Sequence, residues 1–120
     1  MDLTIKEICE QSRSRAIRWH KGSMEAWSVL EWAGAMAGEA GEACNAAKKL
    51  KRLEDGMQSI NAPGRQLSDL QSAKTQVGLE AADTILYAVC LAACVGVDLE
   101  YYLRRAFNTK SEEYGFPERI

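Results

Sequence analysis

Two alanine-rich stretches, each carrying a pair of carboxylates, constrain this chain more than any other feature of its sequence. The first pair is Glu39 and Glu42, and the second pair is Glu80 and Asp83. Residues three apart lie on one face of an α-helix, so each pair presents two carboxylates side by side. Charged side chains are rarely buried without a partner, and no lysine or arginine stands four residues from Glu39 or Glu42.

These carboxylates predict a metal site if the two stretches form antiparallel helices that bring them together. Like charges at contact distance repel, and unmatched carboxyl groups would take up protons. A divalent cation removes that conflict, and all-oxygen ligation favours Mg²⁺, with Mn²⁺ as a second choice, over zinc. A solvated helix face is the alternative interpretation of each pair taken singly. The predicted metal ligands and catalytic residues are Glu39, Glu42, Glu80 and Asp83.

Helix start and stop signals divide the chain into four expected helices and indicate no strand. Thr4 and Glu7 have the spacing of a capping box. Ser23 and Asp98 stand where N-caps are expected, and Gly96 stands where a helix is expected to stop. The expected helices run from Ile5 to the stop at Gly22, from Met24 to Leu53, from Asp69 to Val95 and from Leu99 to Glu112.

Two segments fall outside these helices. Residues 57–65 form a turn-rich connection, and Ser68 with Gln71 has the spacing to cap the third helix. The segment 114–117 breaks the fourth helix and is expected to pack back onto the bundle. The connection carries no motif that assigns it a role.

The second expected helix is apolar around much of its circumference, so it needs more than one packing partner. Gly34, Gly38 and Gly41 lie within it, and each glycine costs about 1 kcal/mol relative to alanine in a helix. We interpret them as sites of close approach by another backbone or a ligand. The expected fold is therefore all-α and four-helix bundle-like, a single domain of residues 1–120 with its core at about 24–112. Its excess apolar surface predicts a homodimer or a dimer of dimers.

Composition excludes several classes of function. A net charge of −2 over 120 residues argues against binding to a nucleic-acid polymer. The four cysteines show no CxxC spacing, which favours free thiols in a reducing, cytoplasmic setting. No uninterrupted apolar run reaches about 18 residues, so we expect no membrane partner. The only histidine, His20, lies outside any Glu-x-x-His pattern, which disfavours a di-iron site or a hydrolytic triad.

The carboxylate pairs and their surroundings resemble those of the MazG-type all-α nucleoside triphosphate pyrophosphohydrolases. This group includes dCTP pyrophosphatases and is related to the dimeric dUTPases. The resemblance covers residues 27–117 and rests on the segments 38–42, 80–83 with Tyr87, 107–108 and 114–117. It implies a helical bundle completed by a second subunit. It also implies Mg²⁺-dependent hydrolysis of a (deoxy)nucleoside triphosphate to the monophosphate and pyrophosphate, with nucleotide-pool house-cleaning as one role.

The same resemblance, together with helical spacing, gives candidate substrate contacts. Lysines, with Arg105, are candidates for phosphate, and Trp27, Trp32 and Tyr87 are candidates for stacking on the base. Solvated surface for the lysines and core packing for the tryptophans are the alternatives. The predicted substrate-binding residues are Trp32, Lys49, Lys51, Tyr87, Asn108 and Lys110. A non-catalytic helical interaction module, or a module that binds nucleotides without turnover, remains the competing class of function.

Overall fold

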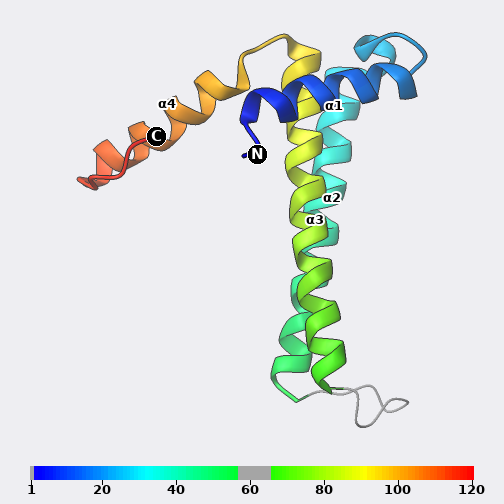
Figure 1. Cartoon of the computed structure of the whole chain (residues 1–120), viewed down its shortest axis with the longest axis vertical. Coiled ribbons are helices and arrows are strands. Elements are labelled where there is room, and N and C mark those ends of the chain that lie inside the picture. The colour runs from blue at the N-terminus through cyan, green and yellow to red at the C-terminus, as the bar shows by residue number, and fades with distance from the viewer. Residues whose placement is uncertain (1, 57–65) are drawn as a thin grey trace. The chain divides into compact units, whose positions relative to one another are not determined.

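The computed structural model describes residues 2–56 and 66–120. In the second range the backbone is described from residue 66 and the side chains from residue 69. Within these ranges the chain forms four α-helices and one short 3₁₀ helix, and no strand (Figure 1). The prediction of an all-α protein is confirmed. The helices are α1 (Ile5–Trp19), η1 (Met24–Ala26), α2 (Val29–Glu54), α3 (Gln66–Val95) and α4 (Leu99–Tyr114).

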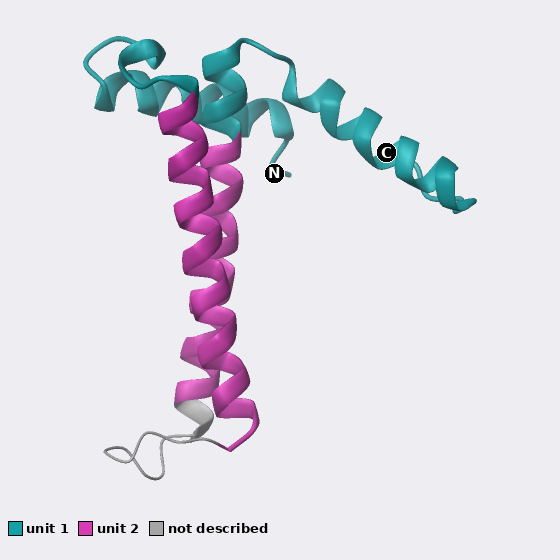
Figure 2. Cartoon of the chain, turned by 180° about the vertical axis from the view of Figure 1, so that it is seen from behind, with its two compact units in different colours: residues 1–29, 89–120 teal, residues 30–88 magenta. Residues whose placement is uncertain are grey.

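The chain divides into two compact units (Figure 2). One unit, residues 30–88, holds nearly all of α2 and most of α3. The other unit combines residues 1–29 with residues 89–120, and so holds α1, η1, the last turns of α3 and α4. A single four-helix bundle completed by a second copy stays a prediction.

The start of α1 follows its sequence signal. The Thr4 hydroxyl accepts a hydrogen bond from the Glu7 backbone N–H at 3.1 Å, and the Glu7 carboxylate accepts one from the Thr4 N–H at 2.9 Å. Hydrogen bonds with Thr4 lower the pKa of Glu7, and the bond to the Thr4 backbone has a larger effect than the bond to its side chain. The predicted capping box is therefore confirmed. The helix ends before Gly22, whose φ of 110° is a left-handed conformation that favours glycine.

The predicted continuous helix from Met24 to Leu53 is wrong at its start. The Ser23 hydroxyl accepts from the Glu25 N–H at 3.1 Å, but this cap begins only η1. Trp27 is extended, with φ −106° and ψ 143°, and it separates η1 from α2. Ser28, which precedes α2, has a glutamate three residues after it, the spacing of a second capping signal that competes with the first.

The later helix ends agree closely with expectation. Gly96 ends α3 with φ 81°, and Asp98 caps α4 by accepting the Tyr101 N–H at 3.2 Å. α4 runs two residues past its predicted end, to Tyr114, and Gly115 caps it with φ 70°. The predicted connection over 57–65 lies outside the residues that the structure describes. α3 begins at Gln66, three residues before its predicted start at Asp69. The predicted cap at Ser68 is therefore wrong, because Ser68 already lies inside the helix.

α2 and α3 lie side by side and antiparallel within the unit of residues 30–88 (Figures 1 and 2). Trp32 is only 2% exposed and lies 6.3 Å, between ring centroids, from Tyr87 on the facing helix. Other large apolar side chains stay in solvent, with Leu79 55% and Ile85 57% exposed. In a hairpin of two helices each helix packs against one neighbour, so apolar side chains on its other sides stay exposed within this unit.

The interior glycines of α2 face open space in this single chain. A Cβ built on Gly34, Gly38 or Gly41 would meet no atom within 4 Å. The predicted close approach at these glycines is therefore not made by any described part of the same chain.

α3 is the one described helix that is long and apolar enough to span a membrane, over Asp69–Val95, within which an 18-residue window has a mean hydropathy of 1.6. Glu80 and Asp83 interrupt this stretch, so it does not form one continuous apolar run. Core helices of many globular proteins have the same composition.

All four cysteines are free thiols, and they differ in exposure. Cys90 is buried, and burial raises the pKa of its thiol. Partial burial, with the charges of Asp98, Glu100 and Glu10, raises the pKa of Cys9. A raised pKa keeps a thiol protonated and unreactive near neutral pH. These two cysteines therefore behave as small apolar residues.

Candidate metal centre

Three of the four predicted ligands come together on the hairpin. Glu39 projects from α2, and Glu80 and Asp83 project from α3. One carboxylate oxygen from each lies within 4.8 Å of the other two. Glu39 and Glu80 are half-buried and Asp83 is exposed, so the group opens toward solvent on one side. We call Glu39, Glu80 and Asp83 the acidic group.

Glu42 does not belong to the acidic group. It is exposed and lies one helical turn after Glu39. Its charge nevertheless reaches Glu39, where it contributes to a raised pKa. Helical spacing puts Glu42 on the same face of α2 as Glu39, but it does not determine the distance from Glu42 to α3.

Electrostatic strain concentrates on Glu39. Partial burial raises the pKa of this carboxyl, and the charges of Asp83, Glu80 and Glu42 raise it further. A hydrogen bond with Glu80 acts in the same direction, because it favours the protonated form of Glu39. Across residues 2–56 and 69–120, no lysine or arginine forms an ion pair with any of these carboxylates.

The donor set fits a hard divalent cation. With bonds of about 2.1 Å, opposite ligands of an octahedral Mg²⁺ lie about 4.2 Å apart and adjacent ligands about 3 Å apart. Oxygens within 4.8 Å of one another reach that arrangement through small side-chain movements. Three carboxylates leave octahedral positions for water or phosphate, the usual pattern of Mg²⁺ sites. The group contains no nitrogen or sulfur donor, which disfavours zinc.

Gln76 is a neighbour of the acidic group that the sequence interpretation missed. Its side-chain Nε2 donates to Glu80 Oε1 at 2.6 Å, from one turn earlier on α3. The Thr84 hydroxyl donates to the Glu80 backbone carbonyl at 2.9 Å and so stays within the helix. Glutamine four residues before a glutamate is a helical spacing that favours such a bond, and that signal was present in the sequence.

The predicted stacking residues divide into two cases. Trp32, at 2% exposed, is packed inside the protein, so core packing is the role the structure shows. Tyr87 is half-buried and lies one turn after Asp83 on α3. Trp27 is half-buried in the other unit, where its ring lies 4.8 Å from that of His20. Tyr87 is thus the one of these aromatic residues placed beside the acidic group.

The lysines of α2 lie far from the acidic group in the same chain. Lys49 and Lys51 follow Glu39 by ten and twelve residues, which is about 15 Å and 18 Å along a helix. Lys51 binds both oxygens of Asp55 at 2.8 Å, and this pairing raises the pKa of Lys51. The structure does not bring these two lysines to the carboxylates within one copy.

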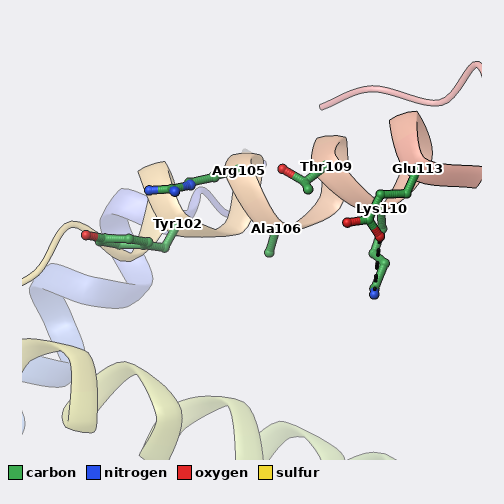
Figure 3. Close-up of a pocket in the computed structure, with 6 residues that line it drawn as sticks. All are labelled: Tyr102, Arg105, Ala106, Thr109, Lys110 and Glu113. Atoms are coloured by element: carbon green, nitrogen blue, oxygen red, sulfur yellow. Dashed lines mark ion pairs between the residues drawn. The ribbon is translucent and has the colours of Figure 1, made fainter.

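The predicted contacts on α4 have partners in their own unit. The Asn108 amide donates to the Ile120 carbonyl at 3.1 Å and accepts from the Ile120 N–H at 3.0 Å, so residue 120 returns onto α4. Tyr114 and Phe116 are 68% and 57% exposed, so the described part of this chain does not show the predicted packing of segment 114–117 onto the bundle. Lys110 lies 3.6 Å from the Glu113 carboxylate, and with Arg105 it lines a shallow pocket on one face of α4 (Figure 3).

Comparisons with known proteins add no relative to this picture. No protein-family model, no curated protein and no solved structure matches the chain. The likeness to MazG-type enzymes therefore depends on the motifs quoted above, and the function is argued from the acidic group.

Proposed function

We propose that this protein is a Mg²⁺-dependent hydrolase that converts a (deoxy)nucleoside triphosphate to the monophosphate and pyrophosphate. One observation carries the proposal: Glu39, Glu80 and Asp83 converge from two antiparallel helices to within 4.8 Å, and no cationic side chain in the described ranges compensates them. A divalent cation is the partner that such oxygens fit. The segments that supply them are the ones that resemble the MazG-type motifs.

The acidic group would hold Mg²⁺, with Mn²⁺ as a substitute. When bound, the ion would neutralise phosphate charge and lower the pKa of a water molecule. We assign to Glu42, which is exposed, one turn from Glu39 and outside the group, the role of accepting a proton from the attacking water. As that water oxygen bonds to phosphorus, the bond between phosphorus and the departing pyrophosphate breaks. Tyr87, one turn from Asp83, is the candidate to pack against the nucleoside.

A second copy of the chain fits this function. The hairpin exposes Leu79 and Ile85, and the glycines of α2 leave room for a close helix. A triphosphate also needs cationic contacts, which the hairpin of one copy does not place near its carboxylates. Lys49 or Lys51 of another copy, or α4, would supply them in a homodimer or a dimer of dimers.

The proposal is tested by incubating the protein with each nucleoside triphosphate and Mg²⁺ and measuring pyrophosphate release. Glu39→Gln and Asp83→Asn should abolish release while circular dichroism shows unchanged helicity. Glu112→Gln, an exposed change on α4, is the matched control and should leave release unchanged. Unaltered release in both site variants would exclude the acidic group as the catalytic centre.

A non-catalytic interaction module is the second candidate, favoured by the exposed aromatic and apolar side chains of α4. Tyr101 is 54% and Tyr102 46% exposed, and the two rings pack edge to face. Such a surface suits a partner helix. Binding of nucleotide without pyrophosphate release would indicate a binding module, and neither binding nor release would favour the interaction module.

A further inference from the structure

Among the residues with described side chains, Gln76 is the one outside the acidic group that donates a hydrogen bond to a side-chain oxygen of the group. The bond from Gln76 Nε2 to Glu80 Oε1 is 2.6 Å long. No lysine or arginine lies three or four residues from Glu80, so no cation on α3 can take this place by helical spacing. The glutamine amide is thus the local group that fixes where the Glu80 carboxylate points.

We infer that Gln76 is a positioning residue that holds the Glu80 carboxylate in its ligating orientation, an inference that rests on the proposed function. A carboxylate that binds a metal is commonly oriented by a hydrogen-bond donor on its other side. A free glutamate side chain must lose rotational freedom when it binds an ion. Gln76 restricts that freedom beforehand, because its amide occupies one Glu80 oxygen.

The neutrality of the donor matters as much as its position. A lysine at residue 76 would also bind the Glu80 carboxylate, but its charge would compete with a divalent cation for the same oxygens. An amide orients the carboxylate and leaves its negative charge available to the ion. The general loss on removing such an outer partner is about 10- to 100-fold in metal affinity.

The test is a Mn²⁺ titration followed by electron paramagnetic resonance, with Gln76→Met compared with the unchanged protein. Methionine keeps the side-chain length and favours helix but cannot donate a hydrogen bond. We expect Mn²⁺ to bind about 10-fold more weakly. Water-proton relaxation should also show more water on the bound Mn²⁺, because Glu80 ligates it less often. Gln71→Met, the same change at another exposed glutamine of α3, should bind Mn²⁺ normally.

The outcomes separate this inference from the function on which it rests. If the unchanged protein binds Mn²⁺ and Glu80→Gln prevents it, yet Gln76→Met binds like Gln71→Met, the positioning role is overturned and the metal site stands. If the unchanged protein binds no Mn²⁺, the proposed function and the role of Gln76 both fail. Equal affinity losses in both methionine variants, with reduced helicity, would also overturn the inference by showing a general effect on α3.

Discussion

Magnesium should stabilise the folded protein through the acidic group, and Asp83→Asn should remove most of that effect. A ligand at about one hundred times its Kd stabilises the folded state by about 2.7 kcal/mol. A chain of 120 residues has an unfolding entropy of about 250 cal/mol/K near 60 °C, so its Tm should rise by about 10 °C. If the substitution weakens binding about a hundredfold, about 0.4 kcal/mol and about 2 °C remain.

Thermal unfolding followed by circular dichroism, at constant protein concentration and ionic strength, measures both effects. Without metal, Asp83→Asn should raise the Tm, because it removes one of three mutually repelling carboxylates. The variant should therefore gain stability without Mg²⁺ and lose the response to Mg²⁺. Glu112→Gln should change neither quantity. An unchanged Tm of the parent protein in millimolar Mg²⁺ or Mn²⁺ would refute this reasoning, as would an equal response in Asp83→Asn.

Three further predictions follow from the same geometry. Glu42→Gln should lower kcat at least about 100-fold while Mn²⁺ titration shows near-normal affinity, and lost Mn²⁺ binding would instead make Glu42 a ligand. Because folding raises the pKa of Glu39 above its usual 4.5, its ionisation destabilises the metal-free fold as pH rises through the folded pKa. Glu39→Gln should thus raise the metal-free Tm at about pH 7 but not at about pH 4, and a gain of equal size at both would contradict this cause. Leu79→Lys should shift the mass measured by light scattering from dimer to monomer, whereas a parent protein that is monomeric at micromolar concentration would exclude the dimer.

Local signals predicted the helix ends well because a cap acts between neighbours in sequence. Thr4 with Glu7, and Asp98, bind backbone groups three residues away, so the sequence contains both partners. The predicted start of α2 is wrong because local signals compete there. Two capping signals, at Ser23 and Ser28, stand close together, and nothing local decides which of them begins the long helix.

The sequence predicts which faces of the two helices carry the acidic group, but it does not predict the distances between the carboxylates. Helical periodicity places Glu39 and Glu42 on one side of α2 with certainty. Which of the two reaches α3 depends on the rotation and offset of the packed helices, and the pattern of a single helix does not contain these. Trp32 illustrates the same limit, since its spacing from Glu39 fits a substrate contact and a core residue equally well, and only its 2% exposure decides.

The charges within α3 bear on what covers its apolar surface. Glu80 and Asp83 lie near the middle of Asp69–Val95, the stretch long enough to cross a membrane. The first turns of this stretch are largely polar, so a bilayer-crossing segment would begin close to Glu80. Each of the two carboxylates would then cost up to about 3 kcal/mol inside the hydrocarbon by insertion scales. In water, the same two carboxylates meet Glu39 at a half-open edge that suits a hydrated cation. Leu79 lies four residues before Asp83 on the same face of α3, so a second hairpin that covered Leu79 would also border the acidic group. There it would be able to supply the cationic side chains that the hairpin of one copy lacks, so one arrangement would account for both the exposed apolar side chains and the uncompensated charges.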